Sequence, residues 1–350
     1  MHGTPFFAIM PVTILDIAKA TGKSFSTVSR ALSASGRISE ETRRLIQEAA
    51  HRMGYHPSFA GTALQKGRTN TLGVLVPEIG TPFYADVIHY LQEYAAEDGF
   101  DISIFTYDFD PVKERRCLKK LLTGICDGVV GFPTSMEHIG AEVETLWQAH
   151  VPFVGIGLPD SDKFPVCYDR VNVDRTEATL EILAILKRHG KRHIVKVEEQ
   201  ITCELSKHME QGFLWCLNEA GFPHDAANTF HHTFPVSNFA AREGMEMIQQ
   251  IFAAYPDTDV IFAWNGPQLY GMLAGLRTLN RRVPEDLMFV TCDDTWLTHY
   301  APVPVLSIDQ RLDLVVRRAY DMFFDRIKSK KWNPPRSEFV TARLSNRYFL

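Results

Sequence analysis

The spacing of apolar and polar residues near the start of the chain predicts short helices. Ile14, Ile17 and Ala18 follow Thr13 at helical spacing, and Asp16 stands three positions after Thr13. That pattern is a capping box, and Gly22 supplies a residue that can end the helix. A second helix is expected over 25–32, with Ser24 as its cap.

A third helix is expected after Ser39, ending near Gly54. Glu40 and Glu41 favour its N-terminal dipole. Its apolar stripe consists of Leu45, Ile46, Ala49 and Met53. A helix, a short turn and a second helix form a helix-turn-helix unit. Residues 11–56 therefore read either as a small DNA-binding domain or as a generic three-helix bundle.

The two faces of the predicted second helix differ in chemistry. One face is apolar, with Val28, Ala31 and Leu32. The other carries Ser26, Ser29 and Arg30, with Phe25 at its border. A merely solvated helix more often carries Glu, Lys or Gln, which are better helix formers than Ser. Small hydroxyls beside one Arg suit close approach to DNA, because hydroxyls hold phosphates and Arg reads guanine.

Downstream of residue 69, short β-branched runs alternate with amphipathic segments. Strands are predicted at TLGVLVP, DISIFTY and DGVVGF, and the alternation resumes after about residue 170 with HIVKV, VIFAW and LMFVTCDD. This βαβ alternation predicts parallel sheets with helices on both faces, arranged as two similar lobes. Between head and body, residues 57–68 begin with Pro57 and contain Gly61, which predicts either a weak hinge helix or a plain linker.

Charge separates the same two regions. Residues 1–70 hold nine Lys and Arg against four Asp and Glu, whereas the remainder holds 28 against 38. A basic head on an acidic body fits a head that meets phosphate. The N-terminus has no signal-peptide pattern, and no run of the sequence has a membrane-spanning pattern. A cytoplasmic location is therefore expected. The six cysteines form no C-x-x-C pair, and neither a metal nor a cofactor is predicted.

Together these segments resemble the LacI/GalR family of bacterial transcriptional regulators. The resemblance lies in VTILDIAKATGKSFSTVSRALS, ISEETRRLIQEAAHRMGYHPS and TLGVLVP, in that order and spacing, and continues more loosely to LSNRYFL. Because most members begin their helix-turn-helix almost at the initiator, Met10 is an alternative start to Met1. The family implies an all-α DNA-binding head, a hinge and a two-lobed, periplasmic-binding-protein-like α/β body.

The resemblance also implies which residues meet double-stranded DNA. Base contacts would be made by Phe25, Ser26 and Arg30, and Leu64 would wedge into a minor-groove step. Phosphate contacts would be made by Thr13, Ser24, Thr27, Ser29, Ser33 and Arg37. The implied protein is a repressor that binds a near-palindromic operator as a homodimer.

In the implied body, residues 69–350, the first lobe comprises about 69–167 and 304–335, and the second about 168–303 and 336–350. The chain would cross between lobes near 168, 303 and 335, and the helix from about 311 to 330 would return to the first lobe. A small-molecule effector would bind between the lobes, at the carboxyl ends of the strands. Its contacts would match Phe83, Tyr84, Met209, Phe239, Asn265, Asp293 and Gln310.

This chain departs from the family pattern in that cleft. Gly157 and Gly266 replace acidic residues, and Met209 replaces an arginine, although Lys207 or His208 could substitute for it. A more apolar cleft is therefore expected, poor at binding simple hexoses. The alternative is a body that dimerises and senses no small molecule.

Enzyme classes find little support in the sequence. Gly155 and Gly157 follow a strand, but Asp160 replaces the third glycine of a dinucleotide-binding motif. No G-x-S-x-G or H-E-x-x-H motif is present, and the pair His231–His232 lacks neighbouring partners. We therefore expect a regulator and not an enzyme.

Overall fold

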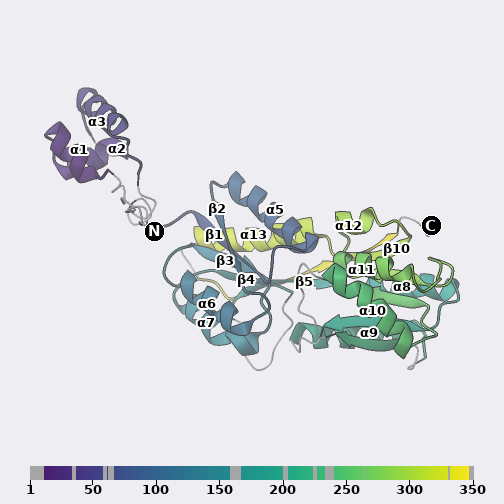
Figure 1. Ribbon diagram of the computed structural model, residues 1–350. Coiled ribbons are helices and arrows are strands. Elements are labelled where there is room, and N and C mark those ends of the chain that lie inside the picture. Colours follow the sequence, from purple (N-terminus) through teal and green to yellow (C-terminus); the bar gives the residue numbers. More distant parts are fainter. Residues whose placement is uncertain are drawn as a thin grey trace. The chain divides into compact units, whose positions relative to one another are not determined.

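A computed structural model describes residues 12–33, 37–57, 61, 67–157, 167–199, 204–223, 227–232, 240–263, 265–329 and 332–346. The chain divides into two compact units, 1–69 and 70–350 (Figure 1). Within the described part, no helix is both long and apolar enough to cross a membrane.

The first unit contains α1 (Ile14–Thr21), α2 (Phe25–Leu32) and α3 (Glu40–Arg52). The predicted caps are confirmed: Thr13 and Asp16 form a capping box, and Gly22 takes the left-handed conformation with φ 64°. Ser24 and Ser39 accept hydrogen bonds from the backbone amides of the third helical residues. The core consists of Ile17, Val28, Ala31, Ile46, Ala49 and Ala50.

One residue of the predicted stripe on α3 lies elsewhere. Leu45 is 41% exposed, whereas Ala50 is buried and takes a place in the core. The inward face of α3 is therefore shifted around the helix, away from Leu45 and toward Ala50, relative to the predicted stripe. A helix of this small unit contacts only two others, so one side of it always remains in solvent.

The second unit contains two six-stranded sheets. The first has the order β11-β5-β4-β3-β1-β2 and is parallel throughout. Its strands are β1 (Thr71–Val76), β2 (Asp101–Thr106), β3 (Gly128–Gly131), β4 (Phe153–Ile156), β5 (Asp169–Asp174) and β11 (Ser337–Thr341). One face packs on α5 (Pro82–Glu97) and α13 (Leu312–Lys328), and the other on α6 (Pro111–Leu121) and α7 (Met136–Gln148).

The second sheet has the order β12-β10-β9-β8-β6-β7, and only β12 runs antiparallel to its neighbour. Its strands are β6 (Ile194–Glu199), β7 (Ala227–His232), β8 (Val260–Ala263), β9 (Met288–Thr291), β10 (Val305–Asp309) and β12 (Arg343–Asn346). Helices α8 (Thr176–Arg188) and α9 (Glu204–Glu219) cover one face. Helices α10 (Ala240–Ala254) and α11 (Gly266–Leu276) cover the other face. Helix α12 (Trp296–His299) is a single helical turn.

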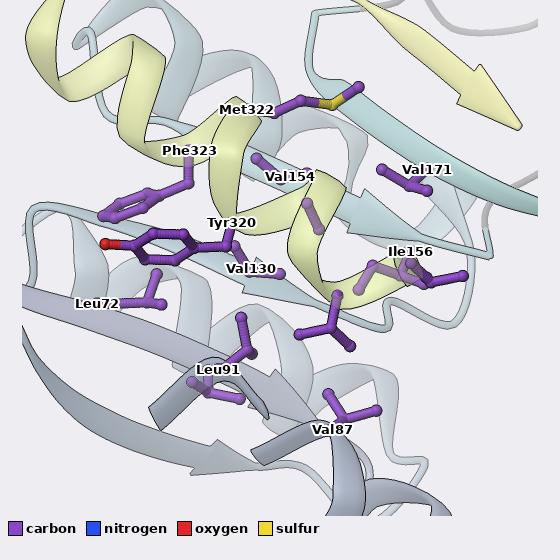
Figure 2. Close-up of a cluster of buried hydrophobic side chains, with 14 of the residues drawn as sticks. Leu72, Val87, Leu91, Val130, Val154, Ile156, Val171, Tyr320, Met322 and Phe323 are labelled. Atoms are coloured by element: carbon purple, nitrogen blue, oxygen red, sulfur yellow. The ribbon is translucent and has the colours of Figure 1, made fainter. Parts of the chain in front are cut away.

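The first sheet is held by one continuous apolar cluster. Val74 and Val76 of β1 are completely buried, as are Leu91 of α5 and Phe323 of α13. Figure 2 shows α13 side chains packed against the strands of this sheet, although α13 comes from the far end of the sequence. The predicted return of this helix to the first lobe is therefore confirmed.

The predicted lobe boundaries need correction. The chain crosses three times, as expected, but not near 168, 303 and 335. β5 pairs with β4 and so keeps 169–174 in the first sheet, whereas β10 pairs with β9 and keeps 305–309 in the second. β11 pairs with β5 in the first sheet before β12 enters the second. Each crossing thus comes later than predicted, because a strand is hydrogen-bonded to its full length before the chain leaves its sheet.

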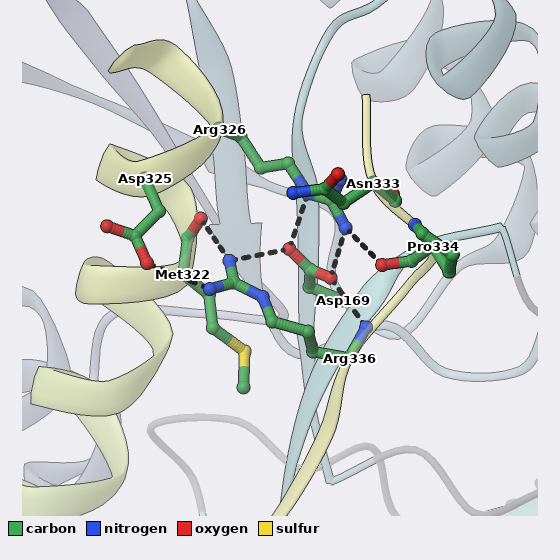
Figure 3. Close-up of polar contacts among 7 residues, drawn as sticks. All are labelled: Asp169, Met322, Asp325, Arg326, Asn333, Pro334 and Arg336. Carbon is green, nitrogen blue, oxygen red and sulfur yellow. Dashed lines mark hydrogen bonds and ion pairs between the residues drawn. The ribbon is translucent and has the colours of Figure 1, made fainter. Parts of the chain in front are cut away.

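Polar contacts tie the start of β5 to α13 and to the segment before β11 (Figure 3). The Asp169 carboxylate, 1% exposed, accepts two hydrogen bonds from Arg326 at 2.8 and 2.9 Å. It also accepts from the backbone N–H and the guanidinium of Arg336, at 2.8 and 3.0 Å. The Arg326 guanidinium lies 4.9 and 5.1 Å from the ring centroids of Trp147 and Trp332. The start of β5 therefore shares one ion cluster with two segments more than 150 residues later in the sequence.

Candidate functional site

The first candidate site is the outer face of α2. Phe25, the first residue of this helix, is 54% exposed, and Ser26 and Arg30 are also exposed. On the inner face Val28 and Ala31 are completely buried, so the predicted division between the faces is confirmed. An exposed phenylalanine costs hydration free energy unless a partner covers it, and here it lies beside a serine and an arginine.

Hydroxyl groups surround the N-terminus of α2. Ser24 Oγ lies 2.8 Å from Thr27 Oγ1 and 3.0 Å from Ser26 Oγ. Ser33 Oγ donates to the Ser29 carbonyl oxygen at 2.8 Å. The contacts among Ser24, Ser26 and Thr27 hold their hydroxyls at the positive end of the helix, the usual place for a phosphate, whereas Ser33 caps the opposite end.

The remaining predicted DNA contacts differ in how they are held. Thr13 Oγ1 donates to Asp16 at 2.7 Å, so this hydroxyl also serves the cap of α1. Arg37 is exposed. Leu64 lies outside the described residues. The described contacts thus lie at the cap of α1, along α2 from one end to the other and, with Arg37, between α2 and α3.

The second candidate site is a cavity of about 90 Å³ between the two lobes. Five of the seven predicted effector contacts line it: Phe83, Tyr84, Asn265, Asp293 and Gln310. The Met209 side chain and Phe239 lie outside the described residues. Residues from α5, α11, the end of β9 and the end of β10 thus meet in one place, as expected where carboxyl ends of parallel strands face each other.

Aromatic rings form one wall of this cavity. Phe83, Tyr84 and Phe132 pack edge to face, with centroid separations of 5.2, 5.5 and 5.6 Å. Phe109 and several aliphatic side chains also line the cavity, as does Gly157, where no acidic group is present. Such a wall suits the apolar face of a ring.

Hydrogen bonds hold the polar residues of the opposite wall. Asn265 Oδ1 accepts from the Gln268 backbone N–H at 2.9 Å and so caps α11. Gln310 Nε2 donates to Asp293 Oδ1 and to the Cys292 carbonyl oxygen, both at 2.9 Å. Burial raises the pKa of the Asp293 carboxyl to about 7, although Arg175 and Gln310 oppose that rise. This carboxyl therefore changes charge near neutral pH.

Sequence reasoning missed Arg175, Phe109 and Phe132. Arg175 follows β5 directly and donates to Gln310 Oε1 at 2.5 Å and to the Val173 carbonyl oxygen at 3.2 Å. Its place after a strand, like that of Phe132 after β3, was a usable signal, since such residues face the cleft. Phe109 reaches the cavity through two successive left-handed residues, Asp108 and Phe109, at φ 52° and 54°. No periodic pattern indicates that turn.

Comparison with known proteins identifies the parts of the chain. Residues 13–58 match the model of bacterial regulatory proteins of the lacI family, and residues 183–348 match the periplasmic binding protein-like domain. The chain is 29% identical over 303 residues to the transcriptional regulator DegA of Bacillus subtilis, covering 86% of this chain and 87% of DegA.

Solved structures share the fold. The lac repressor dimer, bound to operator and the anti-inducer ONPF, aligns with a TM-score of 0.77 at 18% identity, over 97% of this chain and 98% of that one. The complex of the regulator CelR with cellobiose aligns with a TM-score of 0.67 at 24% identity, over 95% and 98%. With the helix-turn-helix head and the two-lobed body, these matches show that the chain belongs to the LacI family of DNA-binding transcriptional regulators.

Proposed function

We propose that this protein is a repressor that binds a near-palindromic operator as a homodimer, and that a small molecule in the interlobe cavity modulates its binding. The observation that carries the proposal is the outer face of α2, where Phe25, Ser26 and Arg30 are exposed on a lacI-family head. The lac repressor, similar in fold, is a dimer bound to operator.

In this proposal Phe25, Ser26 and Arg30 contact base edges in the major groove. Thr13, Ser24, Thr27, Ser29, Ser33 and Arg37 hold phosphates and fix the register of the helix, without reading sequence themselves. Leu64 of the hinge wedges between base pairs and bends the duplex. The base contacts thus supply sequence specificity and the phosphate contacts supply affinity, because only the base contacts differ between one DNA sequence and another.

Selection from random double-stranded DNA tests the operator. The full-length protein is expected to enrich a near-palindrome whose half-sites lie about one helical turn apart. Phe25→Ala together with Arg30→Ala should abolish the enrichment, whereas exposed Arg44→Ala on α3 should preserve it. Enrichment of no sequence, or of a single asymmetric site, would contradict the proposal.

The effector half of the proposal rests on the cavity and on the similarity to CelR, whose solved complex holds cellobiose. Because Gly157 of the cavity and the nearby Gly266 stand where the family resemblance implies acidic residues, simple hexoses are expected to bind weakly. A thermal-shift screen tests sugars, nucleosides and amino acids, and operator binding is then measured with each hit. A hit that changes operator binding indicates a sensing body, and the absence of any hit indicates a body that only dimerises. Micromolar calorimetric binding of glucose, lost in Asp293→Ala, would contradict the expected weakness toward hexoses.

A further inference from the structure

A partly buried arginine, Arg175, lines the interlobe cavity. Arg175 lies at the junction of β5 and α8, where the chain leaves the first lobe. Its two terminal nitrogens donate to Gln310 and to the Val173 carbonyl oxygen. Its Nε is buried and has no hydrogen-bond partner among the described residues. A guanidinium has five N–H donors, so this one retains donors for another acceptor.

No carboxylate of the described chain pairs with this guanidinium. Burial lowers the pKa of the Arg175 guanidinium, and the nearby charges of Asp293 and Asp174 oppose that lowering. Neither carboxylate, however, forms an ion pair with Arg175. Asp174 accepts instead from the Thr176 backbone N–H at 3.0 Å, and Asp293 from Gln310. The Gln310 side chain thus lies between the two, accepting a hydrogen bond from Arg175 and donating one to Asp293. An uncompensated charge in such a place is costly unless an opposite charge joins it.

The same arginine lines a second cavity of about 220 Å³ on the α8 and α9 side of the second sheet. The two cavities share Val173, Arg175 and Cys292. The second also contains Lys196, which is 6% exposed and lies 5.3 Å from the ring centroid of Phe213. Arg175 and Lys196 therefore both line the second cavity, together with the aromatic rings of Phe213, Phe262 and Phe339.

We propose that Arg175 binds an anionic group, a carboxylate or a phosphate, on the small molecule that occupies the cleft. This rests on the proposed effector role of the cavity and names the chemical class of the effector. Guanidinium pairs with planar or tetrahedral oxyanions through two parallel hydrogen bonds, which gives both strength and orientation. The wall of Phe83, Tyr84 and Phe132 then contacts the less polar remainder of the ligand.

Inorganic phosphate and acetate serve as probes for the two kinds of oxyanion. Each is titrated into the full-length protein without DNA, at constant pH and at ionic strength held constant with sodium chloride. A ligand that binds only the folded state raises the unfolding temperature, and at equal concentration the tighter ligand raises it more. At least one probe should stabilise the protein beyond chloride, and the stronger one indicates whether the natural ligand carries phosphate or carboxylate.

Variants assign the effect to Arg175. Arg175→Gln should weaken the apparent affinity for the stabilising anion at least about tenfold, and Arg175→Lys, which keeps the charge, should retain part of it. Exposed Arg188→Gln on the same helix is the matched control and should behave as wild type. Anion binding by the head would be equal in all of these variants.

The inference is overturned if neither anion stabilises the wild-type protein, or if Arg175→Gln responds as strongly as Arg188→Gln. Either result concerns only the charge of the ligand. The operator selection described above is performed without any effector, so failure of the proposed regulatory function would appear there and not here.

Discussion

At the scale of single residues, Arg30 is the sharpest test of base reading. Its side chain is exposed on the outer face of α2. Arg30→Ala is expected to weaken operator binding by about 1–3 kcal/mol and binding to random DNA far less, as for loss of a bidentate guanine contact. Fluorescence anisotropy at one fixed salt concentration measures both affinities, because phosphate contacts make them salt-dependent.

The matched control is Arg44→Ala, since Arg44 is equally basic and its side chain is 80% exposed on α3. It should change the affinities for operator and random DNA alike. If Arg30→Ala also weakens both DNAs to the same degree, Arg30 contacts phosphate and does not read bases.

Asp293 predicts a pH dependence of stability. Burial raises the pKa of its carboxyl from 3.8 to about 7, so between those values the folded state keeps a proton that the unfolded chain releases. The free energy of unfolding contributed by this group therefore falls as pH rises through that window and levels off above it. Asp293→Asn keeps the acceptor for Gln310 but removes the titration, so the variant should gain stability relative to wild type as pH rises.

Thermal unfolding on either side of this window, at mildly acidic and mildly alkaline pH, measures the difference between wild type and variant. Glu114, whose pKa burial also raises to about 7, is present in both and cancels. Asp257→Asn, at an exposed position, is the control and should show no such trend. A difference between Asp293→Asn and wild type that stays constant with pH would show that Asp293 is ionised throughout.

At the scale of elements, the ion cluster around Asp169 joins β5, α13 and the segment before β11 (Figure 3). Asp169→Ala would leave two arginines without their shared carboxylate, and Arg326 is itself 6% exposed. Removing one partner of a buried pair typically costs about 3–5 kcal/mol. Urea unfolding of the variant should show a loss of this size.

An exposed ion pair on the same helix supplies the comparison. Arg317 lies 3.1 Å from Glu97, and both side chains are well exposed. Glu97→Ala should cost only about 0–1 kcal/mol. Equal losses in Asp169→Ala and Glu97→Ala would mean that the buried cluster does not stabilise the joint between these elements.

At the scale of the whole molecule, one recognition helix reads too few base pairs to be selective. Two heads related by a two-fold axis would read two half-sites. We therefore expect sedimentation to show a dimer at micromolar concentration, held by the helices of the body. The same species should persist with Arg30→Ala, since that residue lies in the head. A monomer both without and with operator DNA would contradict the proposed mode of binding.

The sequence by itself determined the local architecture of this protein. Caps such as Thr13–Asp16 and Ser24 act through backbone amides within three residues, so they can be recognised without knowing the rest of the fold. The alternation of apolar strands and amphipathic helices is likewise local, and it predicted the two-lobed parallel architecture. Five of the predicted cleft residues gather in one cavity because they lie just after a strand or at the start of a helix, and these ends share one edge.

Only the tertiary structure decided how distant segments meet. The lobe boundaries depend on which strand pairs with which, and β11 joins β5 across more than 150 residues of chain. The exposure of Leu45 depends on how many helices surround α3. The positive charge in the cleft could not be predicted from the sequence either, because there Arg175 is an ordinary basic residue. It becomes a partly buried cation facing Gln310 only when two lobes close around it, and burial, which removes water from a charge, is a property of the assembled fold.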